Sequence, residues 1–215
     1  TQLTPHDGWD YDSMNESTVI STSVPSGQGK ALVHFDKNGF AYELDAWTGE
    51  IIRADKFVTA NWADHIDLTT GVPVLNPETI AHELQRTSNI CPSQLGGKEF
   101  TPAAYSPNTG SFYIPAINFC SSLEPLEANY IAGSPFMGAD IGFAPDFSGG
   151  SMKPFGEVVA WDPVEGKEKW RWADAVNPLE APPLFGGIVV LLKDDNEFVE
   201  YRIPKDIIST VMDMR

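Results

Sequence analysis

The chain has 215 residues and a formal net charge of −16 at pH 7. An acidic surface of this kind repels phosphate backbones and anionic headgroups, so we exclude nucleic acid and anionic membranes as partners. No apolar run approaches the ~20 residues of a membrane span, and hydrophobic (42%) and charged (20%) residues occur in the proportions of a globular protein.

The segment from His6 to Asp12 concentrates three carboxylates and an imidazole in seven residues. If it is extended, residues two apart share a side, so Asp10 and Asp12 point one way and Trp9 and Tyr11 the other. Neighbouring carboxylates repel unless a cation or proton lies between them, and hard cations prefer oxygen ligands. A metal site is one hypothesis for this segment. A surface turn is the other, because Asp and Gly are turn residues.

A series of short strands is predicted next. Residues 17–35 alternate β-branched and polar side chains around a Pro- and Gly-containing turn, which predicts two strands. Asn38-Gly39 is a strong hairpin signal, and strands are expected on both sides of the following turn, at residues 40–45 and 50–54.

One strand–turn–strand unit recurs along the chain. A strand runs into a turn closed by Gly, and another strand follows, at residues 45–49, 67–71, 106–110 and 162–166. Glycine supplies the positive φ that closes such turns. Recurrent units of this kind indicate a repeat β architecture, here with irregular spacing.

The remaining segments add little helix. Residues 76–90 allow a short helix that starts after Pro77. Residues 121–155 are rich in Gly, Pro and Phe, and we interpret them as a long ordered loop excursion with a short helix near residues 124–129; such loops are often functional. Further strands are expected at residues 157–161 and 188–192, and a terminal helix or strand at 207–212. The predicted class is all-β.

Six stretches, taken together and in order, resemble the pyrroloquinoline quinone (PQQ)-dependent alcohol dehydrogenases of the methanol and ethanol dehydrogenase type. The first includes the sequence His-Asp-Gly-Trp-Asp-Tyr-Asp, and the last, around Trp161, resembles the tryptophan-docking repeat that locks propeller blades together. The stretches are residues 5–16, 34–45, 66–74, 91–98, 104–115 and 160–170.

The resemblance implies an eight-bladed β-propeller with PQQ near its axis. Four-stranded blades need about 40–50 residues each. Residues 1–215 are therefore expected to form a partial propeller of about four blades, half of the ring, with the loop excursion at about 121–155. A half ring leaves sheet faces and edges uncovered. We therefore expect either a second chain that supplies the missing blades or a fragment of a cleaved protein. The sequence begins with Thr rather than Met and shows no signal peptide, so we expect a processed chain or a piece of a longer one.

The resemblance also assigns roles to site residues. Asp10 matches the catalytic aspartate, which takes the alcohol proton beside a metal ion. Asp12 matches an Asp associated with lanthanide-using members, because a trivalent ion needs one more carboxylate than calcium does. Lys37 matches the basic residue that pairs with the cofactor and with the catalytic carboxylate; a hairpin-turn lysine is the alternative. The implied cofactors are PQQ and a lanthanide or calcium ion, the substrate is a small primary alcohol, and the acceptor is a cytochrome c.

The number of cysteines does not decide whether Cys91 and Cys120 form a disulfide or remain two free thiols. No further Cys or His at zinc spacing accompanies them. The resemblance favours a disulfide between them, and with it a periplasmic location.

Two positions depart from the family pattern. Glu99 stands where the family usually has an Asn that touches the quinone, and Glu180 stands where it usually has a Trp. A carboxylate facing an anionic cofactor repels it. An alternative function is therefore a cofactor-less propeller subunit that serves as an assembly or binding module. A third, a carbohydrate- or protein-binding β domain, depends on aromatic content only.

Overall fold

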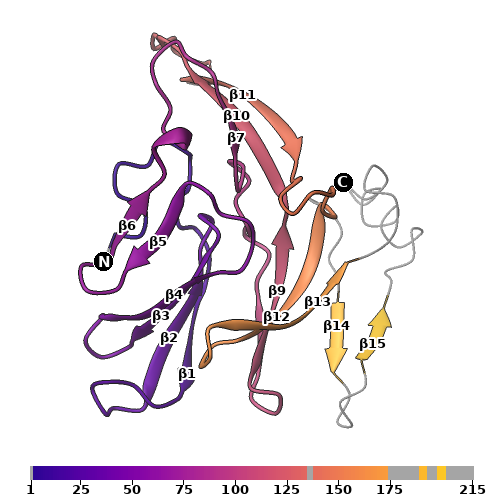
Figure 1. Ribbon diagram of the computed structural model, residues 1–215. Coiled ribbons are helices and arrows are strands. Elements are labelled where there is room, and N and C mark those ends of the chain that lie inside the picture. Colours follow the sequence, from indigo (N-terminus) through magenta and orange to yellow (C-terminus); the bar gives the residue numbers. More distant parts are fainter. Residues whose placement is uncertain (1, 135–137, 174–188, 193–197, 202–215) are drawn as a thin grey trace. The chain divides into compact units, whose positions relative to one another are not determined.

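The computed structural model describes residues 2–134, 138–173, 189–192 and 198–201, and it divides the chain into two compact units (Figure 1). In the second unit, residues 176–215, strands β14 (Val189–Leu192) and β15 (Phe198–Tyr201) pair antiparallel. The first of these is the strand predicted at 188–192. Glu180 and the terminal element predicted at 207–212 lie outside the described residues. All other elements belong to the first unit, residues 1–175.

The first sheet is an antiparallel meander of four strands. They are β1 (Ser17–Ser21), β2 (Lys30–Phe35), β3 (Phe40–Asp45) and β4 (Ile51–Lys56), hydrogen-bonded in that order. The Asn-Gly turn joins β2 to β3, as its sequence predicts. Four consecutive antiparallel strands are the unit of a propeller blade.

A second four-stranded antiparallel sheet has the order β13-β12-β9-β8. Its strands are β8 (Ala104–Ser106), β9 (Ser111–Ile117), β12 (Gly156–Asp162) and β13 (Lys167–Ala173). Strands β9 and β12 pair directly although 38 residues separate them in the sequence. The stretch predicted as a loop excursion is thus an insertion inside a blade-like sheet.

This insertion is more regular than predicted. It contains β10 (Phe119–Pro125) and β11 (Ala139–Pro145), which pair antiparallel, and β10 also pairs with β7 (Thr87–Ile90). The expected short helix near 124–129 is wrong, because strand pairing on both sides of β10 satisfies its backbone and overrides the weak local pattern. At the base of the insertion, Asn118 donates its side-chain amide to Pro154 O at 2.9 Å.

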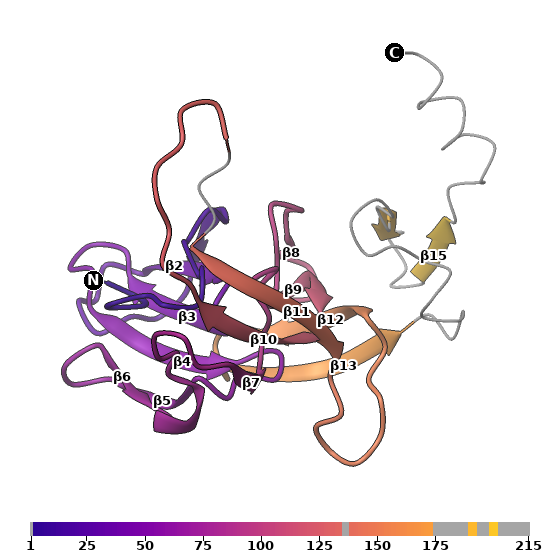
Figure 2. The same ribbon diagram turned by 90° about the horizontal axis from the view of Figure 1, so that it is seen from above.

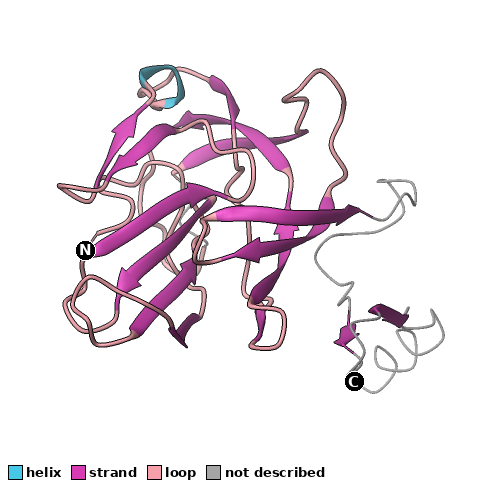
Figure 3. Ribbon diagram, turned by 60° about the horizontal axis from the view of Figure 1, so that its bottom comes forward, coloured by secondary structure: helices cyan, strands magenta, loops and turns pink. Residues whose placement is uncertain are grey.

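A two-stranded ribbon and a single helical turn lie between the two large sheets in the sequence. Strands β5 (Ala63–Asp67) and β6 (Val72–Leu75) pair antiparallel, and the 3₁₀ turn η1 (Pro77–Thr79) follows. The turn is the helix drawn in Figure 3. Asn76 caps it by accepting a hydrogen bond from Glu78 N. The helix predicted within 76–90 is therefore one turn, and β7 takes the end of that range.

The four predicted Gly-closed turns all join paired strands. In three of them an aspartate at the strand end accepts hydrogen bonds from backbone N–H groups two and three residues later; these are Asp45, Asp67 and Asp162. The closing glycines have φ between 61° and 75°. The turn is thus specified locally, by a side-chain acceptor at its start and a glycine at its end.

The two central strands of the first sheet, β2 and β3, are largely buried, and their alternating side chains face two different clusters. Val33 and Phe35 pack in a cluster with Phe112 and Trp161 of the second sheet. Phe40 and Tyr42 pack on the other face in a second cluster, which includes Trp9, Tyr11, Trp62, Ile66, Ile90 and Leu123. Figure 2 shows the first and second sheets from above. Over the described ranges, no helix has the length and hydropathy needed to cross a membrane.

Candidate functional site

The segment around Asp10 is held by its two aromatic residues. Trp9 and Tyr11 are buried and stack with ring centroids 6.0 Å apart. The Trp9 indole N–H donates to Thr79 O at 2.8 Å, and the Tyr11 hydroxyl donates to Pro92 O. The Asp10 and Asp12 side chains point outward, with 68% and 64% of their area exposed. The predicted alternation is confirmed, although the segment is not a strand.

Asp7 fixes the backbone of this segment. Its two carboxylate oxygens accept hydrogen bonds from Trp9 N at 2.9 Å and from Tyr11 N at 2.6 Å. Between them Asp10 has φ 66°, in the left-handed region that non-glycine residues seldom adopt. Burial raises the pKa of the Asp7 carboxyl, and the charges of Asp10 and Asp12 raise it further, against the lowering effect of the two N–H donors. The local conformation is thus imposed by its surroundings.

Lys37 brings the candidate residues together. It lies in the turn between β2 and β3, and its side chain is only 5% exposed. Its Nζ is 3.2 Å from Asp12 Oδ1 and 3.5 Å from Asp10 Oδ2. A third carboxylate, that of Glu99, lies 4.0 Å from the same ammonium. The three residues selected from the sequence thus form one cluster, and Glu99 belongs to it.

Gly96 and Gly97 pack against the backbone of Lys37. Gly97 N donates to Lys37 O at 2.9 Å. Gly96 has φ 75°, and a Cβ placed on it would overlap Lys37 Cγ and lie 2.7 Å from Lys37 O. This approach is open to glycine alone. The stretch 91–98 carries the family resemblance, but its role as a buttress follows from the structure only.

The buried Asp36 ties the Asp10 segment to the hairpin. One of its oxygens accepts hydrogen bonds from the Ser13 hydroxyl and pairs with His34 Nε2 at 3.0 Å; the other accepts from Asn38 N at 2.9 Å. Ser13 follows Asp12 directly, so this contact fixes the far end of the segment. Sequence reasoning gave Asp36 no role beyond a hairpin turn.

An ion pair between the buried Lys98 and the half-buried Glu16 fixes the position of Glu99. Lys98 is fully buried, and its Nζ lies 2.8 Å from Glu16 Oε2 and donates to Glu99 O at 3.2 Å. Glu16 Oε1 also accepts from Ala103 N at 2.7 Å. Burial alone would raise the pKa of Glu16, but the Lys98 ammonium and the Ala103 N–H outweigh it and hold that pKa below its usual value.

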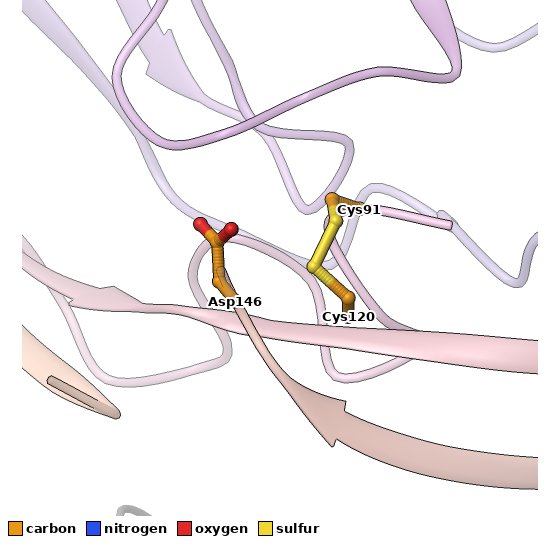
Figure 4. Close-up of side chains that lie close together, drawn as sticks. All are labelled: Cys91, Cys120 and Asp146. Atoms are coloured by element: carbon orange, nitrogen blue, oxygen red, sulfur yellow. A yellow bond between two sulfur atoms is a disulfide. The ribbon is translucent and has the colours of Figure 1, made fainter. Parts of the chain in front are cut away.

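Cys91 and Cys120 form the predicted disulfide, which ties the residue after β7 to β10 of the insertion. The buried Asp146 carboxylate lies beside them, within 4.8 Å of both sulfur atoms (Figure 4). This group is no metal site, because disulfide sulfurs lack the thiolate charge that binds metals. Asp146 pairs with Lys153 Nζ at 3.3 Å instead.

The cluster around Lys37 has the chemistry of a hard-cation site. Its donors are carboxylate oxygens, and the three carboxylates exceed the one ammonium by two formal charges. Asp10 and Asp12 present their oxygens on the exposed side, where a further ligand set can reach them. Oxygen donors with surplus negative charge suit calcium or a trivalent lanthanide.

No family model matches the chain. A curated relative, the lanthanide-dependent methanol dehydrogenase of Methylacidiphilum fumariolicum, is 42% identical over 172 residues, which are 79% of this chain and 28% of the relative. The lanthanide-dependent methanol dehydrogenase of Methylorubrum extorquens is 34% identical over 232 residues, 98% of this chain and 38% of its own length. The quinoprotein ethanol dehydrogenase of Pseudomonas putida is 35% identical over 196 residues, 87% of this chain and 30% of the relative.

A solved structure described as a europium-containing methanol dehydrogenase superposes with a TM-score of 0.74 at 41% identity. The match covers 80% of this chain and 30% of that one. The all-β, propeller-blade fold is thereby confirmed. The chain spans between 28% and 38% of the length of the first curated relatives it matches.

Proposed function

Because the chain belongs to the PQQ-dependent alcohol dehydrogenase family, we propose that it is the part of such an enzyme that supplies the catalytic aspartate, Asp10. Asp10 and Asp12 also supply two carboxylate ligands to the metal ion. The reaction is the oxidation of a small primary alcohol. The observation that carries the proposal is the convergence of Asp10 and Asp12 on the Lys37 ammonium, at 3.5 and 3.2 Å. Three residues chosen for their family positions form one polar cluster.

Asp10 and Asp12 would hold the metal ion. Both side chains are exposed on the same side of the segment, and their oxygens are hard donors. With Lys37 and Glu99 the cluster has a formal charge of −2, so a trivalent ion leaves it positive and a divalent ion leaves it neutral. A positive site favours an anionic quinone cofactor. This balance, together with relatives that are lanthanide-dependent, supports a lanthanide over calcium.

Lys37 would hold PQQ through its ammonium, which extends from a backbone position that Gly96 and Gly97 fix. A bound metal ion would supply a Lewis acid for a quinone carbonyl, and PQQ would supply the hydride acceptor for the alcohol carbon. Asp10 takes the hydroxyl proton of the alcohol on a carboxylate oxygen, as a general base. Asp7 and the buried aromatic pair keep that carboxylate turned outward, toward the substrate.

We further propose that residues 1–215 are about four blades of an eight-bladed propeller, completed by further chain or by a second subunit. The ring, a periplasmic location and a cytochrome c acceptor are carried over from the family. Two relatives are named as subunits, the methanol dehydrogenase [cytochrome c] subunit 1 of Paracoccus denitrificans and the dehydrogenase subunit of a quinone alcohol dehydrogenase of Komagataeibacter europaeus. Co-purification would identify the completing chain.

The test is reconstitution of the whole purified protein with PQQ and either La³⁺ or Ca²⁺. The proposal expects near-ultraviolet absorbance of bound PQQ, a stoichiometric metal and alcohol-dependent reduction of an artificial electron acceptor. Asp10→Asn should abolish the reduction while the protein keeps its melting temperature, because Asn tolerates the left-handed backbone. Absence of PQQ and metal after reconstitution would end the enzyme proposal and favour a cofactor-less assembly or binding module.

A further inference from the structure

Lys37 occupies the place of a cation in this cluster. Its ammonium is buried and lies within 4.0 Å of three carboxylates, those of Asp10, Asp12 and Glu99. Asp10 and Asp12 are largely exposed, whereas the Glu99 side chain is 17% exposed. The ammonium thus stands between two outward carboxylates and one inward carboxylate.

A metal ion and the Lys37 ammonium would compete for the same oxygens. Carboxylate–cation distances for such ions are about 2.3–2.6 Å. An ion bound to the Asp10 and Asp12 oxygens that face Lys37 Nζ would therefore lie close to the ammonium. Like charges at this separation repel strongly in a partly buried site. A cation on these two oxygens would therefore weaken the ion pairs that they make with Lys37.

The backbone of Lys37 cannot move to relieve this repulsion. Gly96 packs directly against it, and Gly97 N is hydrogen-bonded to its carbonyl oxygen at 2.9 Å. The buried Asp36, next to Lys37, is held by Ser13, His34 and Asn38. Relief must come from rotation of the long, flexible Lys37 side chain.

Glu99 is placed to receive the displaced ammonium. Its Oε1 is already 4.0 Å from Lys37 Nζ, a separation that a small side-chain rotation closes to a hydrogen-bonded ion pair. The backbone at Glu99 is held in place, because the buried Lys98 donates a hydrogen bond to Glu99 O and pairs with Glu16. The Glu99 carboxylate, which repels an anionic cofactor, can therefore serve as a partner for the displaced Lys37 ammonium.

We propose that Glu99 is a counterion for Lys37 in an exchange driven by metal binding. When a cation binds to the carboxylates of Asp10 and Asp12, the Lys37 ammonium moves from those two carboxylates to the carboxylate of Glu99. Glu99 is thus a positioning residue that raises the cation affinity of the site without ligating the cation. The inference depends on the proposed function for the metal site only, and neither PQQ nor turnover is needed to test it.

Terbium luminescence of the whole purified protein, without quinone, gives the readout. Trp9 and Tyr11 lie in the same segment as the two carboxylates and can sensitise Tb³⁺ there. Lys37→Met should raise Tb³⁺ affinity about tenfold, since it removes a competing cation, and Glu99→Gln should lower it about tenfold, because Lys37 loses its second partner. In the Lys37→Met background, Glu99→Gln should change affinity no more than about twofold.

Equal losses from Glu99→Gln in both backgrounds would overturn the exchange, because Glu99 would then act as a ligand or a fixed charge. Glu99→Asp should recover part of the affinity in the Lys37 background only. Lys37→Gln serves as a second background if Lys37→Met unfolds the protein, and thermal melts report folding for each variant. No Tb³⁺ signal from the wild-type protein would overturn the proposed metal site itself, and the exchange with it.

Discussion

The close contact between Gly96 and Lys37 makes Gly96→Ala the sharpest test of how the site is held. An alanine Cβ would overlap Lys37 Cγ and lie 2.7 Å from Lys37 O and 3.0 Å from Lys37 Cα. Two of these three atoms are backbone, so side-chain rotation cannot relieve the clash. Carbon atoms pack at about 3.5–4.0 Å, and the hairpin must therefore shift by roughly 1 Å.

Two costs add up in this variant. Alanine at φ 75° costs about 1–2 kcal/mol, and overpacking a filled site costs about 1–3 kcal/mol. We expect the free energy of unfolding to fall by about 2–5 kcal/mol. We also expect the rate of the proposed alcohol oxidation to fall by about 10- to 100-fold, because Lys37 is misplaced relative to Asp10 and Asp12.

Gly27→Ala is the matched control. Gly27 has φ 73°, and a Cβ on it meets nothing within 4 Å. This variant carries the conformational cost without the clash, so it should lose about 1–2 kcal/mol and keep its activity. Urea denaturation and steady-state kinetics of the two variants measure the difference. If Gly96→Ala costs no more stability than Gly27→Ala, the buttress described for Lys37 is refuted.

Three further predictions follow from the site and its supports. Asp12→Ala should reduce La³⁺ affinity at least about tenfold more than Ca²⁺ affinity, because a trivalent ion loses more Coulomb energy with one carboxylate; equal losses by calorimetric titration would contradict this. The double variant Cys91→Ser with Cys120→Ser should lose about 3–4 kcal/mol of unfolding free energy, given a closed loop of 29 residues, and an unchanged urea midpoint would argue against it. Glu16 has a folded-state pKa below its usual value of 4.5 despite burial, so it stabilises the protein above pH 4.5 and loses that contribution as the pH falls through the lowered pKa. Urea midpoints measured down to about pH 3 should therefore fall more steeply for the wild type than for Glu16→Gln, and parallel curves would rule out the Glu16–Lys98 pair as the cause.

The position of Glu99 changes how this departure from the family pattern is understood. Its carboxylate lies beside the Lys37 ammonium, and its backbone is held by Lys98. From the sequence, the Glu99 carboxylate is expected to repel an anionic cofactor. In the structure it is one of three carboxylates that share a single cation, so its effect on the site depends on whether a metal ion is bound. Glu180, the other departure, lies outside the described residues.

Local sequence determined the features that local chemistry controls. The Gly-closed turns at residues 45–49 and 162–166 need an acceptor at the strand end and a glycine at the close, all within five residues. The outward turn of Asp10 and Asp12 follows from alternation with two buried aromatic residues. The turns can be predicted because every partner is a near neighbour in the chain, whereas the two aromatic residues are anchored by distant groups, Thr79 O and Pro92 O.

The tertiary structure alone decided which distant groups meet. Strand β10 forms because its partners are residues 139–145 and 87–90, and nothing within its own sequence specifies that pairing. Asp36 holds Ser13 across 23 residues, and Lys98 pairs with Glu16 across 82. The Asp10 segment could be placed at a site from sequence, but its geometry depends on these contacts, because backbone approach and buried charge pairing are set only when the chain has folded.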